Sequence, residues 1–261
     1  MLYESIYAAG QVTHTDKGTT KPSPLLYALR EQKDMGLRGG IYHRTQIDLT
    51  FNSNHIEGSR LSEEQTRLIF DANSIAADGG TANVDDIIET SNHFRCVDII
   101  IDHAEDRLSQ TFIKTLHKTL KAATSDSRKK WFAVGDYKRL PNEVGGMETT
   151  TPENVRSEMA ALLRRYNATR RRHSLDDILD FHCSFERIHP FQDGNGRIGR
   201  LIMFKECLAA GIVPFIITDA LKPYYYRGIS QWQHVKGFLT DTCLSTQDDY
   251  KRLLDYFRIP Y

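Results

Sequence analysis

The chain has 261 residues, with 34 Lys and Arg against 34 Asp and Glu, so its formal net charge is zero. A protein that binds nucleic acid through a broad positive surface needs an excess of basic residues, and this balance argues against such a partner. Hydrophobic residues make up 40% of the sequence, which is typical of a folded globular protein and too apolar for wholesale disorder.

The cysteine pattern and the apolar runs indicate the compartment. The four cysteines form no CxxC pair, which is typical of scattered thiols in a reducing compartment rather than of a zinc ribbon or a disulfide framework. The N-terminus lacks a basic stretch followed by an apolar one, and no apolar run has the length that a membrane span needs. We therefore expect a soluble, cytoplasmic protein that does not contact a membrane.

The first half of the chain is predicted to be helical after an irregular start. Residues 10–24 contain two prolines and few large apolar residues, which indicates an irregular connection. Helical patterning follows from Leu25, and Gly58 is a candidate helix end. Ser62 and Gln65 then form a capping-box pattern for a new helix, and residues 78–80 interrupt the pattern before it resumes at Val84.

The second half contains one non-helical feature. Ser109 is predicted to cap a helix, whereas residues 131–152 have the short runs, glycines and β-branched residues of a hairpin-like loop. Helices are predicted again over 155–166, 175–188 and 198–210, and after Pro223. The fold class predicted from the residues is therefore mainly α with one small β feature.

The stretch HPFQDGNGRIGR, residues 189–200, carries the chemistry. Pro190 disfavours helical geometry at His189, so it ends the preceding apolar helix. Gly194 and Gly196, separated only by Asn195, let backbone N–H groups approach a ligand closely just where the next helix opens. A glycine-rich turn at a helix N-terminus is typical of an anion site.

The charged residues of this stretch specify the kind of anion. Arg197 and Arg200 are three residues apart and project from nearly the same helix face, which suits a polyphosphate. Asp193 offers a hard oxygen ligand of the kind that Mg²⁺ takes together with phosphate oxygens, and His189 is a natural general base near pH 7. Together they predict phosphoryl or nucleotidyl transfer, although any one of them alone is more often part of an ordinary turn or a solvated helix face.

The same stretch resembles the signature HPFx(D/E)GN(G/K)RxxR of the Fic (Fido) family and matches it at every defined position. The resemblance implies a Fic-type helical bundle and transfer of AMP from ATP to a Tyr, Thr or Ser hydroxyl of a target protein or of the chain itself. Pyrophosphate would be released, and such proteins often form homodimers. Relatives that phosphorylate their targets carry Lys where this chain has Gly196, which favours AMP transfer.

The resemblance also assigns roles to the residues of the signature. His189 would deprotonate the target hydroxyl, and Asp193 would hold Mg²⁺. The phosphate nest that binds the nucleotide would consist of Gly194, Asn195 and Gly196. Arg197 and Arg200 would hold its outer phosphates. Tyr225 lies where family members place tyrosines near the nucleotide base, and packing in the core is its alternative role. His182 is expected to be a core histidine.

Residues 135–152 resemble the target-docking flap of the family. An edge strand there could pair with an extended target segment and present its hydroxyl to His189. The residues expected to contact the target are Asn142, Val144 and Gly145. An ordinary surface hairpin is the alternative interpretation.

The segment 53–58, SNHIEG, resembles the family's inhibitory motif (S/T)xxxE(G/N). Because it precedes the signature, it indicates the type with an N-terminal inhibitory helix. Glu57 would pair with Arg200 and occupy the place that the γ-phosphate needs. In isolation, the pattern would more often be a surface glutamate before a helix-ending glycine.

We therefore predict three regions and keep several functions open. The regions are an N-terminal helical region at 1–105 that contains the motif 53–58, a catalytic domain at 106–245 and a C-terminal helical tail at 246–261. The leading function is a protein AMPylator autoinhibited by Glu57. The alternatives are a de-AMPylase, a transferase of another nucleotide or phosphate group, and a nonenzymatic nucleotide-sensing module.

Overall fold

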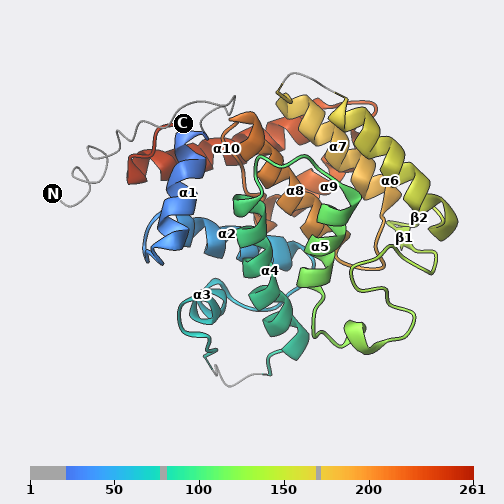
Figure 1. The fold of residues 1–261 in the computed structure, drawn as a ribbon, viewed down its shortest axis with the longest axis horizontal. Helices are drawn as coiled ribbons and strands as arrows, with labels where there is room; N and C mark the ends of the chain where they lie inside the picture. The colour runs from blue at the N-terminus through green and yellow to red at the C-terminus, as the bar shows by residue number, and fades with distance from the viewer. Residues whose placement is uncertain (1–21, 77–80, 169–171) are drawn as a thin grey trace, which may run out of the picture.

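The computed structural model describes residues 22–76, 81–168 and 172–261 (Figure 1). Over these ranges the chain forms ten α-helices, two short 3-10 segments and one two-stranded antiparallel sheet, which confirms the predicted fold class. The predicted irregular stretch before residue 22 and the predicted break at 78–80 lie outside the described residues. No helix within the described ranges is long and apolar enough to cross a membrane.

Three of the first four helices begin at a side-chain cap, whereas the second follows Gly40 without one. The four are α1 (Pro24–Asp34), α2 (Ile41–Ile56), α3 (Glu63–Ala72) and α4 (Val84–Asp102). Ser62 accepts a hydrogen bond from the Gln65 backbone N–H, and Gln65 Oε1 accepts one from the Ser62 N–H, so the predicted capping box is present. Gly58 follows the end of α2 with φ +99°, a conformation that glycine adopts without a steric cost.

The remaining elements follow the predicted order. They are α5 (Gln110–Leu120), a 3-10 turn (Asp126–Arg128), β1 (Glu143–Val144), β2 (Met147–Glu148), α6 (Pro152–Asn167), α7 (Leu175–Ile188), α8 (Asn195–Ala210), a second 3-10 turn (Asp219–Leu221), α9 (Lys222–Gln231) and α10 (Gly237–Phe257). Ser109 caps α5 by accepting from the Phe112 backbone N–H at 3.1 Å, as predicted. The hairpin turns through Gly145 and Gly146, both at positive φ, as a two-residue turn requires.

Helix α8 is the central element of the bundle, because α2, α4, α5 and α7 all pack against it (Figure 1). One hydrophobic cluster joins side chains from both ends of the chain, such as Leu26 of α1, Leu201 of α8 and Leu254 of α10. The N-terminal helices and the helices around the signature therefore share one core. The boundary predicted at 245/246 falls inside α10, which is continuous there.

Candidate active site

The loop between α7 and α8 begins with a histidine in an unusual backbone conformation. His189 follows the end of α7 with φ 50° and ψ 61°, and its N–H donates to the Phe185 carbonyl at 2.9 Å. Left-handed geometry at a residue other than glycine costs about 1–3 kcal/mol and persists only where neighbouring structure enforces it. Pro190 excludes the helical alternative, so the local sequence itself brings His189 out of the helix.

A side-chain latch shapes the rest of the loop. Asn195 Oδ1 accepts from the Phe191 N–H at 2.8 Å, and Asn195 Nδ2 donates to the Phe191 carbonyl at 2.8 Å. Asn195 is buried, with 2% of its surface exposed. The residue expected to line the phosphate nest therefore uses its side chain to close the loop on itself.

His117 of α5, which was not predicted to be a site residue, holds the loop from the other side. Its Nδ1 accepts from the Gly135 N–H at 3.0 Å, so its Nε2 carries the proton and donates to the Asp193 carbonyl at 3.2 Å. Its ring stacks on Phe191 at 4.0 Å. Burial and the nearby Lys121 lower the pKa of His117 to about 3, so it stays neutral at physiological pH.

The loop leads into an uncapped helix N-terminus. Gly194 precedes α8 with φ 86°, and no side chain accepts a hydrogen bond from the first turn of the helix. Backbone N–H groups and the positive end of the helix dipole at such a terminus are the features that the predicted anion site requires. A Cβ at Gly196 would lie 2.3 Å from Glu57 Oε1, so a side chain there would collide with that carboxylate.

The ion pair predicted between α2 and α8 is present. Arg200 is 3% exposed and donates from NH2 to Glu57 Oε1 at 2.7 Å. Ser53, the first residue of the inhibitory motif, accepts from Arg200 Nε through its hydroxyl at 3.0 Å and from NH2 through its carbonyl at 2.9 Å. Two residues of the motif thus engage the second signature arginine.

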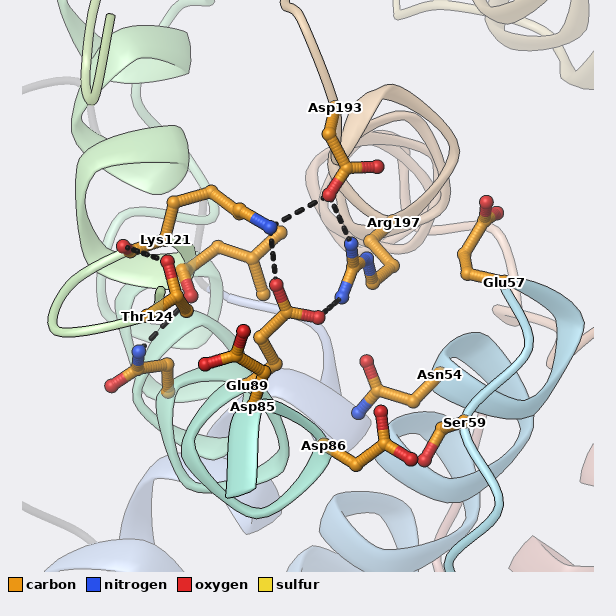
Figure 2. Close-up of polar contacts among 12 residues, drawn as sticks. Asn54, Glu57, Ser59, Asp85, Asp86, Glu89, Lys121, Thr124, Asp193 and Arg197 are labelled. Atoms are coloured by element: carbon orange, nitrogen blue, oxygen red, sulfur yellow. Dashed lines mark hydrogen bonds and ion pairs between the residues drawn. The ribbon is translucent and has the colours of Figure 1, made fainter. Parts of the chain in front are cut away.

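Arg197 is also engaged by carboxylates. Its NH1 pairs with Glu89 of α4, and its NH2 pairs with Asp193 Oδ2 at 3.1 Å (Figure 2). Lys121, which directly follows α5, pairs with both Glu89 and Asp193 Oδ2, the latter at 2.7 Å. Neither Glu89 nor Lys121 was predicted from the sequence. Their position is decided by how α4 and α5 pack on α8, and no spacing in the sequence marks it.

Asp193 can serve as a single cation ligand. Burial opposes its ionisation, but Arg197 and Lys121 outweigh this effect and hold the pKa of Asp193 well below its usual range. Its side chain is 47% exposed, and both of its ion pairs use Oδ2. Mg²⁺ is commonly held by one or two carboxylates together with phosphate oxygens, so Asp193 fits that ion. Among the described residues no group of three or more His, Cys, Asp or Glu side chains could hold a metal on its own.

The electrostatics of His189 suit a base. Burial, with a smaller contribution from Lys138, lowers the pKa of His189 to about 4, so the imidazole is neutral at pH 7. Lys138 itself is buried, and burial lowers its pKa to about 8. A neutral imidazole can accept a proton from a hydroxyl brought within hydrogen-bond reach.

The hairpin is attached directly to this loop. Asn142 Nδ2 donates to the Phe191 carbonyl at 3.1 Å, and the Lys138 N–H donates to the Pro190 carbonyl at 2.9 Å. Asn142 therefore anchors the hairpin. Val144 is 42% exposed and Gly145 lies in the turn, so the strands themselves remain open to a ligand.

Tyr225 packs in the core, which was the alternative to a contact with the nucleotide base. It is 1% exposed, and its hydroxyl lies 2.6 Å from Nε2 of His182, which is equally buried. The Arg200 guanidinium stands 5.8 Å from the centre of the Tyr225 ring. The ring thus packs behind Arg200 and offers no open face for a nucleotide base. His182 is a core histidine, as predicted.

Fold and site together define a helical protein in which a loop with a neutral histidine leads into an uncapped helix N-terminus and holds an attached hairpin. Residues 107–207 match the model of the Fic/DOC family. A Fic domain containing signaling protein from Bacteroides thetaiotaomicron has a similar fold, with a TM-score of 0.66 and 26% identity over 88% of this chain and 90% of that one. Fic-1 from C. elegans has a TM-score of 0.67 at 17% identity, over 90% of this chain and 72% of that one, a likeness of fold alone.

Curated relatives agree with the family match. The chain is 27% identical over 211 residues to the protein adenylyltransferase Fic of Drosophila grimshawi and to that of Drosophila mojavensis. The match covers 77% of this chain but only 39% and 37% of those two proteins. Both comparisons thus relate this chain to the Fic/DOC family, through residues 107–207 and through the curated relatives, and the chain spans about two fifths of the length of these relatives.

Proposed function

We propose that this protein transfers AMP from ATP to a Tyr, Thr or Ser hydroxyl of a target protein, or of the chain itself, and releases pyrophosphate. The observation that carries the proposal is the neutral His189 at the start of the short loop that leads into the uncapped α8 N-terminus. The relatives named protein adenylyltransferases support the same reaction type.

The proposed reaction uses residues already described. An extended target segment pairs with the hairpin, and His189 accepts the proton of its hydroxyl. The hydroxyl oxygen then attacks the α-phosphorus of ATP, and the bond to the β-phosphate bridging oxygen breaks as pyrophosphate leaves. The backbone N–H groups of the α8 N-terminus stabilise the charge on the phosphates. Asp193 would hold Mg²⁺, which would neutralise part of that charge.

We further propose that Glu57 inhibits this reaction. Its carboxylate already occupies Arg200, which would otherwise be free to bind the outermost phosphate. A nucleotide must therefore displace Glu57 or bind without that contact. Activity would then depend on whatever draws the end of α2 away from α8.

Intact-mass spectrometry after incubation with ATP and Mg²⁺ tests the proposal. An adduct of the mass of AMP is expected with Glu57→Gly, and none is expected when His189→Ala is added. ATP that binds but stays unchanged would refute transfer and favour the nucleotide-sensing module. Adducts from other nucleotides in preference to ATP would indicate another transferred group. Loss of AMP from a pre-modified protein, dependent on Glu57, would indicate the de-AMPylase.

Two general properties complete the proposal. All four cysteines, Cys96, Cys183, Cys207 and Cys243, are buried free thiols, which suits the predicted cytoplasmic location. A homodimer remains a prediction, and sedimentation of the purified protein measures it directly.

A further inference from the structure

Four charged side chains form a closed ring beneath the site loop (Figure 2). Lys121 pairs with Glu89 and with Asp193, and Arg197 pairs with the same two carboxylates. Cations and anions therefore alternate around the ring. Two members, Asp193 and Arg197, belong to the family signature, whereas Glu89 comes from α4, ahead of the region that matches the family model.

The ring is buried on every side except at Asp193. The side chains of Lys121 and Arg197 are 2% and 5% exposed, and that of Glu89 is 14% exposed, against 47% for Asp193. Burying charges of this kind is costly unless they are paired, so the ring has one favourable arrangement. In it both cations hold Asp193 by Oδ2, and Figure 2 shows Oδ1 pointing away from the ring.

The charge of the ring balances. Two cations face two carboxylates, and the additional partner of Lys121, Asp126, is itself paired with Lys129 at 2.6 Å. Without Glu89, two buried cations would act on Asp193 alone and would repel any further cation brought to its free oxygen. Without Lys121, the excess would be negative and would repel a phosphate at the α8 N-terminus.

We propose that Glu89 and Lys121 are positioning residues that turn one oxygen of Asp193 outward and set the local charge, and thereby the coupling between a divalent cation and the nucleotide. This inference rests on the proposed function, since it takes ATP as the ligand of the α8 N-terminus. The two residues need not touch ATP. They act through Asp193 and Arg197.

The test measures the dissociation constant of ATP by calorimetry, once in EDTA and once in Mg²⁺, and takes the ratio of the two constants. Glu89→Gln makes the ring positive, so ATP is expected to bind more tightly in EDTA. The increase in ATP affinity that Mg²⁺ brings is then expected to be smaller. Lys121→Met makes it negative, so both changes are expected to reverse. Each ratio should shift by about fivefold or more, the lower end of typical coupling between bound ligands.

The double variant Glu89→Gln, Lys121→Met is the matched control, because it restores the neutral charge. Its ratio should return to within about twofold of the wild-type value. If every variant weakens ATP binding by the same factor in EDTA and in Mg²⁺, the ring serves stability alone and the inference is overturned. Should Glu89→Gln not fold, Glu89→Asp retains the charge with a shorter reach and should reduce the gain from Mg²⁺. Loss of folding in every variant would equally assign the ring to stability and overturn the inference.

The two proposals can fail separately. Opposite shifts of the ratio without an AMP adduct would support the ring and refute AMP transfer. An AMP adduct with unchanged ratios would support transfer and refute the positioning role.

Discussion

Removing the charge of Glu57 tests the contact between α2 and α8 most directly. Glu57→Gln keeps the size of the side chain and the backbone of the helix end, but replaces the carboxylate that lies 2.7 Å from Arg200 NH2. Arg200 stays held by Ser53 through Nε and NH2, so its position should change little. The substitution therefore isolates the charge from the packing.

The expected size of the effect follows from the geometry. A hydrogen bond to a charged partner contributes about 1.5–3 kcal/mol, and the 27% exposure of the Glu57 side chain places this one toward the lower end. Each 1.4 kcal/mol corresponds to a factor of about ten in an equilibrium constant. ATP no longer has to compete with the carboxylate, so its affinity and the rate of automodification are expected to rise by about tenfold.

Calorimetry of ATP binding and labelled-AMP incorporation are the two assays. Glu158→Gln, at an exposed glutamate of α6, is the matched control and should leave both quantities unchanged. Adding His189→Ala to Glu57→Gln should abolish incorporation while ATP still binds. If Glu57→Gln and the wild type agree within about twofold in both assays, Glu57 is not an inhibitor.

Three further outcomes are expected. Asn195→Ala breaks both bonds of the loop latch and leaves the buried Phe191 N–H and carbonyl unpaired, so the free energy of unfolding in urea should fall by about 1–3 kcal/mol; an unchanged midpoint would contradict this role. The Glu57→Gln variant should lose activity only as the pH falls to about 4 or lower, because His189 protonates there and loss of the Glu57 carboxylate lowers the His189 pKa further. Adding Lys138→Met should move this acid limb to higher pH, because it removes a cation that lowers the His189 pKa; a limb that stays in place would exclude the Lys138 contribution. Burial lowers the pKa of three histidines to about 3, which are His93, His117 and His182. Below about pH 6.5 these histidines bind protons in the unfolded chain but not in the folded one, so the free energy of unfolding should fall by up to about 1.4 kcal/mol per pH unit for each of them. Urea titrations at pH 7 and pH 5 measure this fall.

Local signals were the reliable part of the sequence analysis. The capping box at Ser62 and the cap at Ser109 were found because their hydrogen bonds join residues three apart. The end of α7 before Pro190 was also predictable from local sequence, because proline restricts the backbone of the residue that precedes it. Features of this kind require no knowledge of the rest of the fold.

The sequence by itself determined the mainly helical class and the loop that ends α7 and leads into α8, and its resemblance to the inhibitory motif predicted the pairing of Glu57 with Arg200. Only the tertiary structure decided that Glu89 and Lys121 close a ring on Asp193 and Arg197. The reason is physical. A capping or turn signal acts within one helical turn, whereas the partner of a buried charge depends on which helix faces the packing of the core brings together.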